Sequence, residues 1–241
     1  MPFDINSLSP VEALLSPVRH STHPWLTWYS QSGERVELSG RVFDNWVAKS
    51  ANLLHEEFDL APGDIVATDM PGHWKSAALA LACWHLGAEL RSVAPGTNPG
   101  KVSLFITSSA QTLNVDGSVE VLVVPLPSLA MSYEGELPVG ATDYASEVRA
   151  YADSFFPSPI DVAATALSSE SGQQSFTELF VPSGAEGTTL LTTEWPIERV
   201  LPALVGLWAN GTSVVLVEDG VSITDRLISG ERVVHRLEQK L

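Results

Sequence analysis

Short apolar runs and longer stretches with helical spacing alternate along most of the chain. After Ser39, apolar residues recur every three or four positions from Phe43 onward, which predicts a helix that begins after this N-cap and ends near Phe58. The stretch 74–86 is apolar on nearly every side, so we expect a helix that is buried on most faces. Gly87 follows this stretch and suits the left-handed conformation that commonly ends a helix.

Runs of strand-forming residues lie before, between and after these helices. The pattern predicts a hairpin over 25–38, because two such runs flank the turn sequence Gln31-Ser-Gly-Glu34. Further strands are expected at 65–68, 88–93, 102–106, 119–124, 162–167, 188–192 and 213–217. Because strands and helices alternate, the order is typical of βαβ units and a parallel sheet.

Four further segments complete the pattern. A helix is expected over 141–154, between two proline-rich stretches, and another over 196–209, which begins with a proline suited to the first helical position. A last amphipathic helix is expected over 222–241, with a break at Gly230. The segment 175–180 fits either a short strand or the start of a helix.

These elements predict an α/β fold of layered, mostly parallel sheets flanked by helices. The 241 residues, 44% of them hydrophobic, suffice for one sizeable core. Prolines punctuate the chain after about residue 125, so we expect an N-terminal α/β lobe over 1–135, a connector helix within 136–160 and a second α/β lobe over 161–241. The connector carries aromatic residues to bury, so the second lobe is expected to pack on the first in one compact domain.

The chain is strongly acidic, with a formal net charge of −16 from 29 acidic and 13 basic residues. This charge disfavours nucleic acid and anionic membranes as partners, because binding to both depends on Lys and Arg. Two readings of the charge stay open, solubility alone or an acidic docking surface. The N-terminus lacks the pattern of a signal peptide and no apolar run could span a bilayer, so a cytoplasmic location is expected.

Candidate chemistry is sparse. Cys83, the single cysteine, lies in an apolar stretch and is expected to pack as a small hydrophobe. His20 and His23 form a close histidine pair, but no third ligand lies near them in sequence, so no metal site is predicted. The G-x-S-x-G motif of α/β-hydrolases does not occur. Trp195 lies between the strand 188–192 and its helix, where open α/β sheets bind ligands, and is a candidate for lining a pocket.

Several motifs occur in an order typical of one known family. Leu38-Ser39 opens a helix, Leu60-Ala-Pro-Gly-Asp-Ile-Val-Ala67 follows it, Met70-Pro71 and Leu86-Gly-Ala-Glu89 come next, and 204–217 reads L-V-G-L-W-A-N-G-T-S-V-V-L-V. In this order the motifs resemble the N-terminal part of AMP-forming acyl-CoA synthetases, which are adenylate-forming, AMP-binding enzymes. The segment 137–149 is similar to a short actinobacterial family of unknown function that is remotely similar to these enzymes. The resemblance implies that this chain adopts the fold of the N-terminal domain of acyl-CoA synthetases, in a truncated form.

The resemblance places a phosphate-binding loop in the polar stretch that follows the strand 162–167. In the family this loop reads T-S-G-T-T-G-x-P-K-G, and its backbone N–H groups and lysine hold the ATP phosphates. Ser168, Ser169, Ser171 and Gly172 keep part of that pattern, so the resemblance makes them candidate cofactor-binding residues. The stretch is shorter than the family loop, however, and it contains no lysine.

Glu170 lies inside the same stretch and would repel phosphate, so we expect no nucleotide cofactor, neither ATP nor AMP. The later family motifs Y-G-x-T-E and T-G-D do not occur, and neither does a C-terminal domain with its catalytic lysine. We therefore assign no catalytic residue and favour a non-catalytic homologue that binds a small molecule or a protein. Two alternatives stay open: an enzyme of another class, and a half-site protein completed by a partner chain that binds nucleotide or acyl-adenylate.

Overall fold

The computed structural model describes residues 9–184 and 186–237. Its strands are β1 (Pro24–Tyr29), β2 (Arg35–Ser39), β3 (Ile65–Thr68), β4 (Glu89–Ser92), β5 (Leu104–Thr107), β6 (Glu120–Val123), β7 (Thr142–Asp143), β8 (Thr165–Ser169), β9 (Gly172–Ser175), β10 (Thr189–Thr192), β11 (Val214–Val217) and β12 (His235–Leu237). Its α-helices are α1 (Pro10–Leu15), α2 (Gly40–Phe58), α3 (Trp74–His85), α4 (Tyr144–Glu147), α5 (Phe176–Leu179), α6 (Ile197–Ala209) and α7 (Asp225–Gly230). Short 3₁₀ helices cover Ala110–Thr112 and Val148–Ala150.

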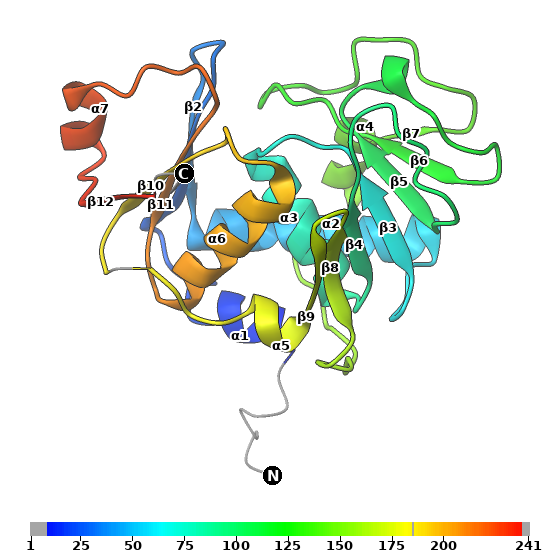
Figure 1. Cartoon of the computed structure of the whole chain (residues 1–241), viewed down its shortest axis with the longest axis horizontal. Coiled ribbons are helices and arrows are strands. Elements are labelled where there is room, and N and C mark those ends of the chain that lie inside the picture. The colour runs from blue at the N-terminus through cyan, green and yellow to red at the C-terminus, as the bar shows by residue number, and fades with distance from the viewer. Residues whose placement is uncertain (1–8, 185, 238–241) are drawn as a thin grey trace.

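Two mainly parallel sheets lie on either side of the helices α2, α3 and α6 (Figure 1). Within residues 9–184 and 186–237, one sheet has five strands in the order β12-β10-β11-β1-β2, and the other has seven in the order β7-β6-β5-β3-β4-β8-β9. Neighbouring strands run parallel except in two hairpins, β1 with β2 and β8 with β9. This arrangement confirms the predicted α/β fold of mostly parallel sheets flanked by helices.

The helices α2 and α3 form as their sequences indicate. The hydroxyl of Ser39 accepts a hydrogen bond from a backbone N–H of the first turn of α2 at 3.3 Å. The N-terminus of α3 is capped by His73, whose Nδ1 accepts from the Lys75 N–H at 3.1 Å. All twelve residues of α3 are buried, and Gly87 follows the helix with a positive φ of 75°. This positive φ confirms the predicted left-handed conformation of Gly87. Glycine suits the position because any residue with a side chain would be strained at this φ.

The helix predicted over 141–154 forms only in part, from residue 144 to residue 150. The chain there forms β7, the single turn α4 and a 3₁₀ helix, and residues 151–154 are not helical. The side-chain amide of Asn52 on α2 donates to the carbonyl oxygens of Ala152 and Ser154, at 2.9 and 3.0 Å. Because α2 supplies partners for these carbonyl groups, the backbone does not need helical hydrogen bonds to satisfy them.

The final helix predicted over 222–241 is also wrong, apart from the short helix α7. Arg232 adopts a positive φ of 53°, and the chain then forms β12, which pairs in parallel with β10. The β-branched residues Val233 and Val234 favour an extended chain, and the edge of β10 offers it hydrogen-bond partners. Residues 238–241 of the predicted helix lie outside the described residues.

Each sheet takes strands from both sides of the predicted connector. The five-stranded sheet joins β1 and β2 to the three strands after residue 188, and β8 and β9 extend the sheet formed by β3 to β7. The lobes expected over 1–135 and 161–241 therefore do not each hold a sheet of their own. Parallel strands need long crossover connections, and these carry the chain from one sheet to the other and back. One buried apolar cluster joins both sheets, with Leu26 and Leu216 in one and Leu90 and Leu122 in the other.

Trp84 illustrates how α3 ties these layers together. Its side chain is fully buried, and its indole N–H donates to the carbonyl oxygen of Ala166 on β8 at 2.7 Å. Its ring meets that of Phe180 edge-on, with 5.8 Å between the centroids. Cys83 beside it is also fully buried, and burial raises the pKa of its thiol to about 12. Within the described residues, no helix is long and apolar enough to cross a lipid bilayer.

Candidate functional site

A cavity of about 400 Å³ lies where four strands end, and we call it the carboxyl-edge pocket. Its lining residues follow β3, β4 and β8 in the seven-stranded sheet and β10 in the five-stranded sheet: 69–72, 92–95, 169–170, 193 and 195–198. The carboxyl ends of parallel strands are the usual ligand-binding edge of an open α/β sheet, because the loops that leave them face a common crevice.

The polar stretch expected to form a loop is instead a β-hairpin. Ser168 and Ser169 belong to β8, Gly172 belongs to β9, and only Glu170 and Ser171 form the turn between the strands. The expectation of a loop is wrong because β9 is an edge strand, where polar side chains face solvent at little cost while the backbone pairs with β8. A two-residue turn leaves little free backbone to surround a phosphate group.

The candidate serines of this hairpin have different hydrogen-bond partners. The hydroxyl of Ser168 donates to the carboxylate of Glu89 at 2.5 Å, so it is turned to a neighbour on β4. The hydroxyls of Ser169 and Ser171 are 2.7 Å apart and share a hydrogen bond. Of the five predicted site residues, Ser169 and Trp195 line the pocket together, whereas Ser168, Ser171 and Gly172 do not line it.

Trp195 stands at the entrance to α6. Pro196 is the N-cap of that helix, with an extended backbone, so the proline lies one position earlier than the first helical residue predicted for it. The guanidinium carbon of Arg199 lies 4.9 Å from the centroid of the Trp195 ring, within the range of a cation–π contact. The indole therefore forms a half-buried wall of the pocket, held by a cation from the first turn of α6.

The charge of the carboxyl-edge pocket is negative. Asp69, Glu170 and Glu198 line it, and no Lys or Arg occurs among its described lining residues. Glu198 accepts a hydrogen bond from the Ser92 hydroxyl at 2.8 Å. One carboxylate oxygen of Asp69, Oδ1, is buried and has no hydrogen-bond partner among the described residues, and burial raises the pKa of this carboxyl. Such a set of groups repels phosphate and tolerates an uncharged or positively charged molecule.

Sequence reasoning did not single out Asp69, Ser92 or Glu198. A signal for them was present, because Asp69 directly follows the strand β3, Ser92 ends β4, and Glu198 is in the first turn of the helix after β10. Polar residues at the ends of parallel strands converge on one edge of the sheet, and this rule would have found all three. Over the described ranges, no three His, Cys, Asp or Glu side chains are grouped so that they could hold a metal ion.

The fold and the position of this pocket define a class of protein. The architecture is that of the N-terminal domain of acyl-CoA synthetases. The chain superposes on an acyl-CoA synthetase from Brucella canis with a TM-score of 0.71 and 17% identity, covering 95% of this chain and 47% of that one. For acetoacetyl-CoA synthetase from Streptomyces lividans the TM-score is 0.67 and the identity 17%, over 95% of this chain and 42% of that one. The chain thus spans about half the length of these two structures.

A curated relative then places the chain in a family. It is 31% identical over 242 residues to a TIGR03089 family protein of Mycobacterium tuberculosis (strain ATCC 25618 / H37Rv), covering 93% of this chain and 96% of that protein. The chain belongs to the TIGR03089 family. No protein-family model matches the sequence.

Proposed function

We propose that this chain is a non-catalytic relative of the adenylate-forming enzymes, which binds an uncharged or positively charged small molecule in the carboxyl-edge pocket. The observation that carries the proposal is the β8–β9 hairpin, whose turn consists of Glu170 and Ser171 where the family resemblance places a phosphate-binding loop. The scaffold and its ligand-binding edge are kept, whereas the groups that attract phosphate are replaced by groups that repel it.

Electrostatics supports this reading. Two like charges 4 Å apart repel each other by about 4 kcal/mol at the effective dielectric constant of a protein surface, near 20. A triphosphate in this pocket would meet Asp69, Glu170 and Glu198, and no Lys or Arg among the described lining residues would offset them. The hairpin turn offers few free backbone N–H groups to compensate, because its flanking residues Ser169 and Gly172 pair with each other.

A thermal-shift titration tests the proposal. The probes are ATP with Mg²⁺, AMP, CoA and a non-hydrolysable acyl-adenylate analogue, with tryptamine as a cationic aromatic probe. A ligand at a hundred times its dissociation constant stabilises a protein by about 2.7 kcal/mol, which gives a clear shift in melting temperature. We expect no shift with ATP·Mg²⁺. A shift with ATP or with the adenylate analogue would show that nucleotide binding survives, and the proposal would be wrong.

A charge-reversal pair makes the test sharper. Glu170→Lys removes a carboxylate from the pocket and adds a cation, and we expect its affinity for ATP·Mg²⁺ to rise about tenfold or more above that of the wild type. The matched control is Glu136→Lys, which makes the same change of net charge at an exposed position that does not line the pocket. Equal affinity in the two variants would mean that Glu170 does not govern phosphate binding.

A further inference from the structure

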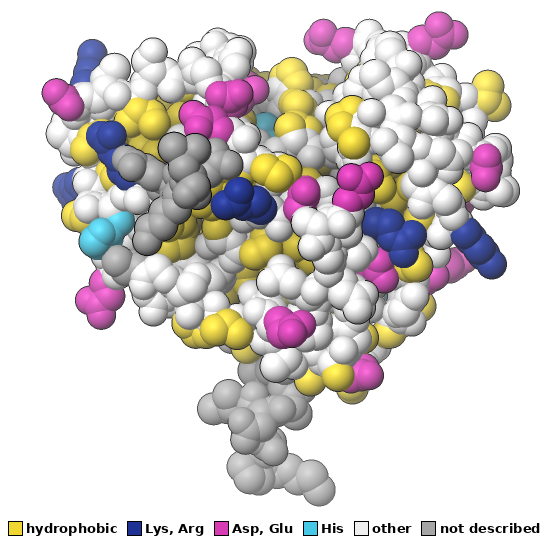
Figure 2. Space-filling model, viewed as in Figure 1, with side chains coloured by type: hydrophobic (Ala, Val, Ile, Leu, Met, Phe, Trp, Pro, Cys, Tyr) yellow, Lys and Arg dark blue, Asp and Glu magenta, His cyan; other side chains and the backbone are white. Residues whose placement is uncertain are grey.

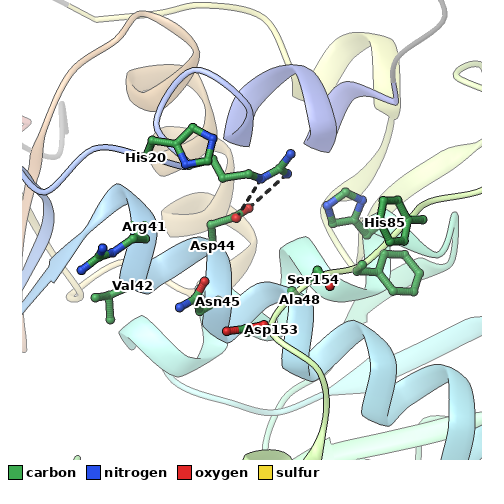
Figure 3. Close-up of a pocket in the computed structure, with 12 residues that line it drawn as sticks. His20, Arg41, Val42, Asp44, Asn45, Ala48, His85, Asp153 and Ser154 are labelled. Atoms are coloured by element: carbon green, nitrogen blue, oxygen red, sulfur yellow. Dashed lines mark hydrogen bonds and ion pairs between the residues drawn. The ribbon is translucent and has the colours of Figure 1, made fainter.

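A second and larger cavity, of about 620 Å³, lies beside α2, and we call it the α2 cavity. Among the described residues, four segments enclose it: the turn after α1, the first half of α2, the last residue of α3 and residues 153–156 of the connector. Figure 3 shows His20 and Arg41 at one end, His85 and Ser154 at the other, and Asp44 between them. Its volume lies within the range of small-molecule sites, which is about 300–1,000 Å³. It shares no lining residue with the carboxyl-edge pocket.

His85 gives this cavity an unsatisfied polar group. Its side chain is only 3% exposed, and its Nδ1 has no hydrogen-bond partner among the described residues. Buried polar groups in proteins are nearly always hydrogen-bonded, so an unpaired one calls for an explanation. Burial lowers the pKa of His85 to about 4, so the ring is neutral near pH 7 and offers one donor and one acceptor nitrogen.

Aromatic and apolar side chains surround the same end of the cavity. The rings of His85 and Phe155 meet edge-on, with centroids 5.5 Å apart. Phe156 also lines the cavity although its side chain is 89% exposed, and Val42 on α2 is 37% exposed. A large aromatic ring left in solvent at the rim of a hollow provides an apolar surface that a flat ring can cover.

The charges around the cavity nearly balance. Arg19 donates to the carboxylates of Glu12 and Asp44, at 2.8 and 2.9 Å, so its charge is already compensated. Arg41 and Asp153 line the cavity with opposite charges, and neither takes part in an ion pair with another described residue. This balance does not favour a charged ligand of either sign, because each ion would meet one repelling group as well as one attracting group.

We propose that the α2 cavity binds a small uncharged aromatic molecule that carries a hydroxyl or amide group, with its ring against Phe155 and Phe156 and its polar group hydrogen-bonded to His85. Phe155 and Phe156 favour a ligand with an aromatic ring, and the neutral imidazole of His85 favours an uncharged hydrogen-bonding group. The balanced charges disfavour an ionic ligand. The site is independent of the function proposed for the carboxyl-edge pocket.

NMR spectroscopy of the whole chain, observing the histidine rings and the tryptophan indoles, tests this proposal with three probes. Phenol has the ring and the hydroxyl, toluene lacks the hydroxyl, and benzoate carries a charge. We expect phenol to shift the His85 signals and to bind about five- to tenfold more tightly than toluene, the effect of one neutral hydrogen bond. Equal affinities of phenol and toluene, tighter binding of benzoate, no binding at all, or shifts at Trp195 in place of His85 would each overturn the proposal.

Two variants identify the contacts. His85→Phe keeps the ring packing and removes the nitrogens, so phenol should bind no more tightly than toluene. Phe156→Ala changes an exposed side chain that folding does not require, and it should weaken both probes by a similar factor of about two to five. Its matched control is Leu129→Ala, which is 88% exposed and does not line the cavity. Unchanged phenol affinity in Phe156→Ala would overturn the proposal even if His85→Phe fails to fold.

Discussion

The two cavities lie at opposite ends of the same helix and recruit ligands by different means. Gly72, just before α3, lines the carboxyl-edge pocket, and His85, the last residue of α3, lines the α2 cavity. The first cavity has three carboxylates and one indole, whereas the second has charges of both signs that nearly balance, the imidazole of His85 and two phenylalanine rings. The position of the carboxyl-edge pocket follows from the strand order, because the carboxyl ends of parallel strands lie at the same edge of a sheet. The α2 cavity, in contrast, is formed by segments that lie far apart in the sequence and that no common sequence motif links.

This difference teaches what the strong negative charge of the chain does. Acidic side chains are scattered over the face shown in Figure 2 and do not gather in one patch there. In the carboxyl-edge pocket, by contrast, three carboxylates converge and the described lining contains no cation, so any ligand there meets a negative local charge. The charge is therefore expected to affect ligand choice locally, in one cavity and not in the other.

The largest expected effect concerns the helix that both cavities share. Trp84→Ala removes a fully buried indole that joins α3 to β8, and it should lower the free energy of unfolding by about 3–5 kcal/mol. Trp195 is half-buried at the carboxyl-edge pocket, so Trp195→Ala should lower the free energy of unfolding by only about 1 kcal/mol or less. Urea denaturation measures both. Similar losses in the two variants would mean that Trp195 is part of the core and not a wall of a pocket.

The next effect is a loss of stability in acid. Burial lowers the pKa of His73 to about 3 and that of His85 to about 4, below the ordinary value of about 6.5. As the pH falls below about 6.5, the unfolded chain binds protons that the folded chain does not, so stability is lost. Between pH 7 and pH 5 each histidine should cost about 2 kcal/mol.

Chemical denaturation at both pH values checks this prediction. The decrease between pH 7 and pH 5 should shrink by about 2 kcal/mol in His85→Phe. It should stay as in the wild type in Leu129→Ala, which changes an exposed side chain that does not titrate. An unchanged pH dependence in His85→Phe would show that this ring is accessible to protons in the folded chain.

A smaller effect is expected at the wall of the α2 cavity. Arg19→Gln removes the guanidinium that joins Glu12 on α1 to Asp44 on α2 and leaves Asp44, which is only 6% exposed, without its ion partner. We expect a loss of about 1–2 kcal/mol. Arg35→Gln is the matched control, since Arg35 also joins two carboxylates but its side chain is more exposed, and it should cost about 1 kcal/mol or less. A larger loss for Arg35 would reverse this ranking.

Much of the fold could be predicted from the sequence because local signals agreed with the packing. The cap at Ser39, the apolar faces of α2 and α3, and Gly87 each fixed an element where it was expected. Predictions failed where the deciding group lies far away in sequence. Asn52 satisfies the chain near residue 152, and the edge of β10 recruits β12, and neither partner is visible in a local pattern.

The candidate site was predictable only in part, for the same reason. The family resemblance led to Ser169, and the position of Trp195 after a strand led to the same pocket. Which serines face the pocket depends on the alternation of side chains along a hairpin, and that hairpin was not predicted. The α2 cavity had no signal at all, because His85 on α3 and Phe155 in the connector meet only in the folded chain.

The most direct test of the central claim, that the carboxyl-edge pocket no longer supports activation of a carboxylate, is an ATP–pyrophosphate exchange assay. The purified chain is given ATP, Mg²⁺, labelled pyrophosphate and a panel of fatty and aromatic carboxylates. We expect no incorporation of label into ATP above the blank without protein, for any carboxylate. Exchange that depends on both the carboxylate and the protein would show that the chain is an adenylating enzyme and that the proposed non-catalytic role is wrong.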